Sequence, residues 1–170
     1  MDFQIRVATT NDIDVIWNLL QQGIEKRRVE GSNQWQDGYP NRDVVVNDVK
    51  NQYGIVVENE SSEIIAYIAM IADIEPAYEE IIGDWISPNS EKYVVFHRLI
   101  VDQTNPIKGL ATWMMHKVEH FVVEKGIQSI KVDTNFDNVG MLRVFDKLGY
   151  QYCGKVYFRG SERLAFEKII

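Results

Sequence analysis

The sequence predicts a mixed α/β fold in a single domain spanning residues 1–170. Apolar residues alternate with polar ones in several segments, which is the spacing of half-buried strands. In other segments they recur every three or four positions, which is the spacing of amphipathic helices. The composition, with 45% hydrophobic and 25% charged residues, is that of a globular protein of one domain. We expect the order strand, two helices, three strands, helix, strand, helix and two strands.

The first half of the chain is expected to form a strand, two helices and a hairpin. Phe3, Ile5 and Val7 alternate with polar residues, and an apolar helical face follows Asn11, which we expect to be an N-cap. A polar stretch at 59–62 separates two β-prone segments, as in a hairpin. The expected elements are a strand at 3–7, a helix at 13–24, a helix at 45–53 that Gly54 closes, and strands at 55–58 and 64–74.

The second half begins with a long acidic connection. Residues 73–92 contain six acidic residues against Lys92 alone, and Pro76, Gly83 and Pro88 interrupt any long helix. Clear periodicity returns after this connection. The expected elements are a strand at 93–101, a helix at 109–125 before Gly126, a strand at 127–133, a helix through Met141, Val144 and Leu148 that ends at Gly149, and two strands within 150–170.

Charge and composition narrow the function classes. The formal net charge of −7 argues against a nucleic-acid partner held by general attraction to phosphates. Cys153 is the one cysteine, so an internal disulfide cannot form. His116 and His120 lie one helical turn apart, but no third ligand accompanies them, and we expect no metal. No basic leader or long apolar run is present, so we expect a cytoplasmic protein without a membrane partner.

One segment combines a strand, a turn and a helix in a way that suits an anionic ligand. Leu99–Val101 ends the strand, Pro106 and Gly109 lie in the turn, and the helix follows directly. Backbone N–H groups converge at the positive end of the helix dipole after such a turn, which is a site for phosphate oxygens. The glycine patterns of ATP-binding and dinucleotide-binding loops are absent, so neither ATP nor NAD is expected.

Two motifs and the order of elements resemble the GCN5-related N-acetyltransferase (GNAT) family, which transfers an acetyl group from acetyl-CoA to an amine. Residues 106–111 are similar to the family's pyrophosphate loop. Gly109 and Ala111 match the pattern, and Pro106 replaces the usual Gln or Arg. Residues 138–150 are similar to a later motif, in which an Asn opens a helix that ends in Lys-Leu-Gly before an aromatic residue. The expected order of strands and helices is that of the GNAT fold.

The resemblance implies a set of residues that bind acetyl-CoA. The pantetheine arm would pair with the main chain of the strand at Leu99, Ile100 and Val101. Amides of the loop would hold the pyrophosphate, and Lys108 would add a cation. These amides belong to Ile107, Lys108, Gly109, Leu110, Ala111 and Thr112. We expect Pro106 to weaken this binding without abolishing it. Asn138 would bond the pantetheine or a water molecule, or cap the last helix, and both roles are compatible.

The resemblance also places His97 where related enzymes carry a glutamate as general base. A His is suited to this task because its ordinary pKa of ~6.5 lies near neutrality. The alternative is a strand residue that simply bonds a neighbour, and Arg98 is expected to be structural. The family's Tyr acid is replaced by Phe145. Water or one of Tyr150, Tyr152 and Tyr157 could supply the acid instead, although each of these tyrosines is expected in the core. Cys153 could be a nucleophile, but it too is expected in the core.

Trp35 and Tyr39, together with the acidic residues of 73–92, come from the regions that form the acceptor side in similar proteins. Negative charge would attract a cationic amine, and aromatic rings could stack on it. The alternative is that these acids only keep the protein in solution.

The sequence therefore favours an enzyme, an acetyl-CoA-dependent N-acetyltransferase. It would act on a primary amine of a small molecule or a peptide, by direct transfer in a ternary complex. The alternative is a non-catalytic CoA- or acyl-CoA-binding sensor or scaffold, motivated by Pro106 and Phe145. A structural interaction domain is a third reading. The acceptor, the length of the acyl chain and the oligomeric state, a homodimer included, stay open.

Overall fold

The computed structural model describes residues 2–170 and divides into two compact units. One unit contains the chain up to Met70 together with Arg98–Met114, and the other contains Ile71–His97 and Met115–Ile170. Across residues 2–170 the strands form a mixed sheet of eight strands accompanied by helices, which confirms the predicted fold class. None of the helices in this range is long and apolar enough to cross a membrane.

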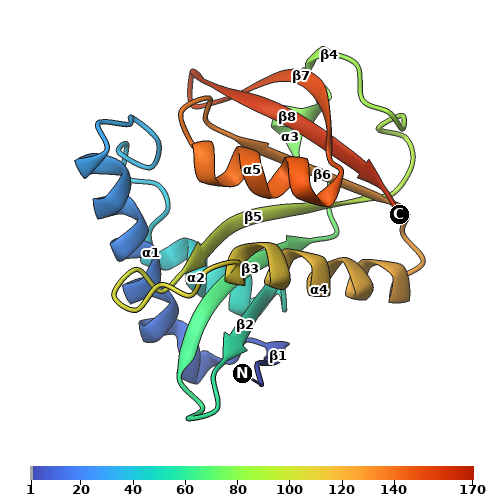
Figure 1. Ribbon diagram of the computed structural model, residues 1–170. Helices are drawn as coiled ribbons and strands as arrows, with labels where there is room; N and C mark the ends of the chain where they lie inside the picture. Colours follow the sequence, from blue (N-terminus) through green and yellow to red (C-terminus); the bar gives the residue numbers. More distant parts are fainter. Residues whose placement is uncertain (1) are drawn as a thin grey trace. The chain divides into compact units, whose positions relative to one another are not determined.

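The first unit is built from an antiparallel group of strands and two helices. β1 pairs with β2 and β2 pairs with β3, both antiparallel, and Figure 1 shows these strands side by side. Most residues of β2 and β3 are buried, as are Ile16, Leu19 and Leu20 of the first helix, whereas β1 is partly exposed. The elements are β1 (Gln4–Val7), a short 3-10 turn (Thr10–Asp12), α1 (Ile13–Val29), α2 (Arg42–Lys50), β2 (Gly54–Glu58) and β3 (Ile64–Ile71).

The prediction that Gly54 closes the second helix is wrong. Helix α2 begins after Asn41, whose side chain accepts a hydrogen bond from the Val44 amide at 3.0 Å, and it ends at Lys50. Gly54 is instead the first residue of β2. A Cβ at Gly54 would lie 3.1 Å from a ring carbon of Tyr67 and 3.2 Å from the Ala8 Cβ. The glycine therefore serves close packing between strands and not the end of a helix.

The second unit contains a parallel pair and a long antiparallel hairpin. β5 (Tyr93–Val101), whose residues from Arg98 onward belong to the first unit, runs parallel to β6 (Ser129–Thr134). β6 pairs antiparallel with β8 (Ser161–Ile169), and β8 pairs antiparallel with β7 (Gln151–Phe158). The remaining helices are α4 (Leu110–Glu124), whose last part belongs to this unit, and α5 (Val139–Leu148). As predicted, α5 ends at Gly149, which adopts φ +81°.

The acidic segment 73–92 contains two short elements that the sequence did not predict. They are α3 (Pro76–Glu79) and β4 (Ile82–Gly83), which pairs with β7. A Cβ at Gly83 would lie 2.2 Å from the Cys153 carbonyl oxygen, and a Cβ at Gly154 would lie 2.2 Å from the Ile82 carbonyl oxygen. Only glycine permits the two backbones to approach this closely. The segment is thus attached to β7 by its main chain.

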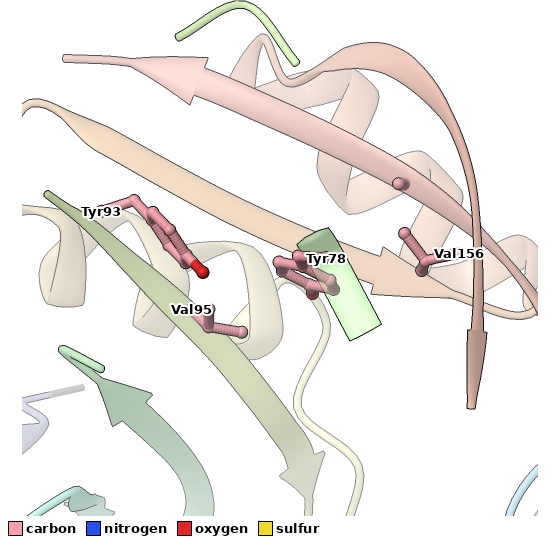
Figure 2. Close-up of a cluster of buried hydrophobic side chains, with 5 residues drawn as sticks. Tyr78, Tyr93, Val95 and Val156 are labelled. Atoms are coloured by element: carbon pink, nitrogen blue, oxygen red, sulfur yellow. The ribbon is translucent and has the colours of Figure 1, made fainter. Parts of the chain in front are cut away.

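The core of the second unit lies on both faces of β8. A buried cluster joins Tyr78 of α3 to Ala165 of β8 and to the residues of β5 and β7 labelled in Figure 2, which are Tyr93, Val95 and Val156. The next residue of β8, Phe166, packs against Phe145 of α5, with ring centroids 5.1 Å apart. Successive strand residues point to opposite faces, so α3 and α5 cover opposite faces of β8.

Candidate functional site

The loop between β5 and α4, residues 102–109, lies in the first unit and is fixed at its start. The Asp102 amide donates to the Ile65 carbonyl at 2.8 Å, and the Asp102 carboxylate accepts from the Thr104 amide at 2.9 Å and hydroxyl at 2.7 Å. The Gln103 amide donates to the side chain of Gln22 at 2.9 Å. The loop therefore leaves the strand in a defined direction.

The second half of this loop combines a glycine in a left-handed conformation with the first amides of α4. Gly109 adopts φ +83°, and no heavy atom lies within 4 Å of the place where its Cβ would be. The Leu110 amide donates to the Ile107 carbonyl at 3.2 Å, so it is used within the turn. Within residues 2–170, the amides of Ala111 and Thr112 have no backbone acceptor. They lie at the positive end of α4, where an anion is stabilised.

The predicted pantetheine strand, Leu99–Val101, follows an irregular residue of β5. Arg98 has φ +57°, which is unusual for a non-glycine residue inside a strand. Its guanidinium is buried and pairs with Asp48, with contacts of 2.6 and 2.9 Å to the two carboxylate oxygens. The Asp48 carboxylate also accepts a hydrogen bond from Tyr67. Arg98 is therefore a structural residue, as predicted.

The two aromatic residues predicted for the acceptor side are packed within the first unit. The Tyr39 hydroxyl accepts a hydrogen bond from Arg98. Trp35 lies against α1, because a Cβ at Gly23 would be 3.0 Å from the Trp35 ring and 2.7 Å from Ile100 Cδ1. Both side chains are partly exposed. Trp35 is thus an anchor of its loop close to the strand that is predicted to hold pantetheine.

His97 lies in the second unit between two carboxylates. Its Nε2 is 3.1 Å from Oε2 of Glu75, and its Nδ1 is 3.9 Å from Oδ2 of Asp133. The same Asp133 oxygen accepts a hydrogen bond of 2.6 Å from the Tyr78 hydroxyl. The exposed fraction of the side chain is 21% for Glu75, 14% for His97 and 8% for Asp133. Exposure therefore decreases from Glu75 through His97 to Asp133.

The surroundings of this cluster hold its members in place and set their charge. The Glu75 amide donates to the Tyr93 hydroxyl oxygen at 3.0 Å, and the Glu75 carboxylate caps α3 by accepting from the Ala77 amide at 3.4 Å. The Phe158 ring meets the His97 ring edge to face, with centroids 5.8 Å apart. Burial raises the pKa of the Asp133 carboxyl, whereas His97 and the Tyr78 hydrogen bond act in the opposite direction.

Sequence reasoning found His97 and missed the residues that surround it. Glu75 was counted among the acids of 73–92, and its place beside His97 depends on the turn before α3. Asp133 gave a usable signal, since it interrupts the β-prone stretch 127–133 and a carboxylate in a buried strand requires a partner. Tyr78 gave none, because a Tyr in an acidic connection has no distinctive spacing.

The residues predicted from the later motif have structural roles. The Asn138 side chain accepts from the Met141 amide at 3.3 Å and so caps α5, which is the alternative that the sequence left open beside a ligand contact. Phe145 is 2% exposed and belongs to the core. The Tyr150 hydroxyl is buried and donates to Glu119 at 3.1 Å. The prediction that all three candidate tyrosines are core residues is wrong for Tyr152 and Tyr157, which are exposed on β7.

Cys153 is buried in β7, as predicted. Burial raises the pKa of its thiol, which disfavours the thiolate that a nucleophile requires. Among residues 2–170, no three His, Cys, Asp or Glu side chains are placed to hold a metal ion.

Two buried charges hold the end of the acidic segment. Glu167 of β8 is fully buried and accepts hydrogen bonds from the Ile86 amide at 2.6 Å and the Ser87 amide at 3.2 Å. Lys131 of β6 is also fully buried, and its ammonium donates to the Asn89 side chain at 2.7 Å. The Lys131 ammonium also lies over the rings of Trp85 and Tyr93. The segment is therefore an ordered part of the second unit.

Comparisons with known proteins agree on one family. The sequence model of the acetyltransferase (GNAT) family matches residues 20–150. No curated protein matches the sequence significantly. The crystal structure of a GNAT-family acetyltransferase from Streptococcus agalactiae is 36% identical, with a TM-score of 0.88, and the match covers 99% of this chain and 95% of that one.

More distant structures share the fold. A GNAT-family acetyltransferase from Listeria monocytogenes is 18% identical, with a TM-score of 0.79 and coverage of 99% of this chain and 95% of that one. A ribosomal-protein-alanine N-acetyltransferase from Brucella melitensis is 13% identical, with a TM-score of 0.71 and coverage of 98% and 99%. At these identities the likeness concerns the fold alone.

Proposed function

The chain belongs to the GNAT acetyltransferase family, and we propose that it transfers the acetyl group of acetyl-CoA to a primary amine of a small molecule or a peptide. Both substrates would be bound together, so the transfer is direct. The observation that carries the proposal is the placement of His97, whose ring contacts one carboxylate and faces another. A protein that only binds acyl-CoA has no need of such a group.

Acetyl-CoA is proposed to bind through the first unit. The amides of Ala111 and Thr112 lack a backbone acceptor within residues 2–170, and the open space at Gly109 leaves room for phosphate oxygens beside the main chain. Lys108 is exposed and adds a positive charge. The pantetheine arm is assigned to the main chain of Leu99–Val101. These features fit a pyrophosphate group. Because Pro106 has no backbone N–H, the loop has one amide donor fewer.

The reaction requires the loss of a proton from the amine before it attacks. An alkylammonium ion has a pKa near ~10, so a base must take one proton. We assign this to His97. The nitrogen of the neutral amine then bonds to the acetyl carbon, the bond from that carbon to sulfur breaks, and CoA leaves as a thiolate. A second proton passes from the nitrogen to the thiolate. The CoA thiol has an ordinary pKa of ~8.5, so the thiolate can leave without a side-chain acid. This is consistent with Phe145, which is buried and has no proton to donate.

The acceptor is proposed to be a cation when it arrives. Glu75 is the most exposed carboxylate of the His97 cluster. Asp73, Glu79 and Glu80 are exposed on the same segment and add negative charge. Trp35 and Tyr39 stay predictions for the acceptor side, as do the cytoplasmic location and the organisation as one domain.

The first experiment measures thermal stability with and without acetyl-CoA. A ligand at 100 times its Kd adds about 2.7 kcal/mol to the free energy of unfolding and raises the midpoint by a few degrees. We expect such a rise. No rise at millimolar acetyl-CoA would refute the proposed cosubstrate.

The second experiment is a screen of primary amines for release of CoA, with His97→Gln as the comparison. Positioned general bases contribute about 10²–10⁴-fold to the rate, so we expect kcat to fall by a factor in that range. Acetyl-CoA should raise the thermal midpoint of this variant as much as it raises that of the unsubstituted protein. Acetyl-CoA binding without turnover on any amine would favour the alternative function, a non-catalytic acyl-CoA sensor or scaffold. The buried Phe145 in place of a Tyr acid is the observation that keeps this alternative.

A further inference from the structure

The two carboxylates beside His97 make unequal contacts with its ring. The Nε2 contact with Glu75, at 3.1 Å, is within hydrogen-bond range, and the Nδ1 contact with Asp133, at 3.9 Å, is beyond it. A carboxylate at neutral pH has no proton to donate, so the hydrogen in the shorter contact belongs to Nε2. When the ring is neutral, its proton therefore lies on Nε2 toward Glu75, and Nδ1 is the unprotonated nitrogen.

This resting arrangement is unsuited to catalysis. Nε2 already carries a proton and cannot accept another. Nδ1 can accept one, but it faces Asp133, whose side chain is 8% exposed and whose oxygen is occupied by the Tyr78 hydroxyl. An incoming amine would instead meet the Glu75 carboxylate, which is the most exposed member of the cluster. Some event must therefore move the proton before His97 can serve as the base.

We propose that the acceptor amine binds as a cation to Glu75, and that its arrival moves the proton of His97 from Nε2 to Nδ1. This inference rests on the proposed function. An ammonium group has three donors and competes with Nε2–H for the Glu75 oxygens. Once the ammonium occupies Glu75, Nε2–H loses its acceptor, whereas a proton on Nδ1 faces the carboxylate of Asp133. Nε2 is then unprotonated beside the ammonium.

The proton count balances at each step. The change of tautomer releases one proton from Nε2 to water and takes one at Nδ1, so the ring stays neutral. The ammonium then gives one proton to Nε2, which leaves a neutral amine and an imidazolium ring. Each N–H of that ring faces one carboxylate, Glu75 or Asp133. Asp133 is thus a positioning residue, because it acts through His97 and does not touch the amine.

The groups packed around the ring are compatible with this exchange. Glu75 precedes α3, Tyr78 lies in α3, and Asp133 lies in β6. β5 contributes Tyr93 through its contact with Glu75, and β7 contributes the uncharged ring of Phe158. Burial raises the pKa of the Asp133 carboxyl, whereas the positive charge of Arg163 of β8 acts in the opposite direction and favours the ionised form. An ionised Asp133 is what the proton on Nδ1 requires.

The proposal predicts the class of acceptor. The exchange is driven by a positive charge at Glu75, so alkylamines that are protonated at neutral pH should be acetylated. Aromatic amines, which are uncharged at neutral pH, should not displace Nε2–H from Glu75. Their turnover should be at least about tenfold lower, as expected for loss of a charged hydrogen bond.

The decisive test needs no acceptor. The chain has three His residues, and His116 and His120 are exposed, so a background with both replaced by Gln leaves one imidazole to observe. Nitrogen-15 NMR at pH 8 then reports which ring nitrogen of His97 carries the proton. We expect Nε2–H in this background. Glu75→Leu removes the oxygen that accepts from Nε2–H, so the proton should move to Nδ1, which faces Asp133. Asp133→Asn and the control Glu79→Gln should keep Nε2–H.

Each NMR result decides the proposal. A proton on Nδ1 before any substitution, or a His97 ring that keeps Nε2–H in Glu75→Leu, would overturn it. Proton NMR spectra with the chemical-shift dispersion of the unsubstituted protein would show that every variant is folded. The result is independent of turnover, so a protein with these tautomers and no acetyl transfer would refute the proposed function alone.

Kinetics separate the two carboxylates. Glu75→Gln should raise the KM for an alkylamine at least about tenfold and leave the KM for acetyl-CoA unchanged. Asp133→Asn should lower kcat by about tenfold or more and shift the pH profile, with little change in the amine KM. An unchanged amine KM in Glu75→Gln would contradict the assigned contact, and an unchanged pH profile in Asp133→Asn would contradict the positioning role.

Discussion

The loop after β5 and the cluster around His97 are built by opposite means. The loop uses the main chain of consecutive residues, a glycine with φ +83° and amides at the start of α4. The cluster uses side chains that are distant in sequence, since Glu75 precedes His97 by 22 residues and Tyr78 is 55 residues from Asp133. The comparison teaches that a binding site made of backbone tolerates changes in side chains, whereas a site made of side chains depends on the packing of the whole unit.

The largest effect is expected where a buried charge supports the second unit. Glu167→Ala would leave the Ser87 and Ile86 amides without their acceptor and would remove the negative charge that favours the protonated form of the buried Lys131. Removing one member of a buried charged group costs about 3–5 kcal/mol, which urea denaturation measures as a loss in the free energy of unfolding.

The control for Glu167→Ala is Glu162→Ala. Glu162 bonds the exposed Lys155 at 3.2 Å and is half exposed. Exposed ion pairs contribute little to stability because water and salt screen them, so the control should be nearly neutral. Equal losses in both variants would contradict the view that buried side chains support this unit.

A substitution where β4 pairs closely with β7 is expected to cause the next largest loss of stability. Gly83→Ala places a Cβ 2.2 Å from the Cys153 carbonyl oxygen at a residue with φ +133°. Because the Cβ is fixed to the backbone of β4 and the oxygen belongs to the backbone of β7, the strands must separate, at a cost of about 3 kcal/mol from overpacking and backbone strain. Gly160→Ala, with φ +75° and nothing within 4 Å, keeps the strain and omits the clash. It should cost about 1–2 kcal/mol, and thermal unfolding compares the two.

The loop itself can be tested with a matched pair of glycines. Gly109 and Gly126 have φ +83° and +71°, and both have open space where a Cβ would be. Substitution by Ala should destabilise each by about 1–2 kcal/mol. Gly109→Ala alone should weaken the binding of acetyl-CoA, by about tenfold for the loss of one or two amide hydrogen bonds. Calorimetric titration measures both affinities, and an equal change in the two variants would contradict the assignment of the loop.

The same contrast explains what could be predicted from the sequence. The strand predicted at 93–101 coincides with β5, and the helix predicted at 109–125 differs from α4 by one residue at each end, because both have long periodic patterns. Helix α3 and strand β4 are four and two residues long, too short for a period to be seen. The loop could be predicted from the sequence because its residues are consecutive. His97 was placed by its spacing from Gly109, but Glu75 and Asp133 are brought to it by tertiary packing, which no local pattern records.

The smallest effect compares one carboxylate from each unit. The Arg6 hydrogen bonds hold the pKa of Asp12 below its ordinary value, whereas burial raises the pKa of Asp133. Asp12 therefore contributes stability above the unfolded pKa of about 4, and that contribution is lost as the pH falls below it. For Asp133 the sign is reversed, because a raised pKa favours folding only while the group is protonated, and the contribution is lost as the pH rises above about 4.

Two variants distinguish the opposite pH dependences that Asp12 and Asp133 give to the stability. Arg6→Met should lose on the order of 1 kcal/mol at pH 7, and the difference from the unsubstituted protein should shrink as the pH falls below about 4. Asp133→Asn should gain stability relative to the unsubstituted protein as the pH rises from 4 toward 7, while transfer declines. Urea denaturation at each pH measures both differences. If both variants changed in the same direction with pH, the buried carboxylate of the second unit would not be the destabilising charge that the position of His97 requires.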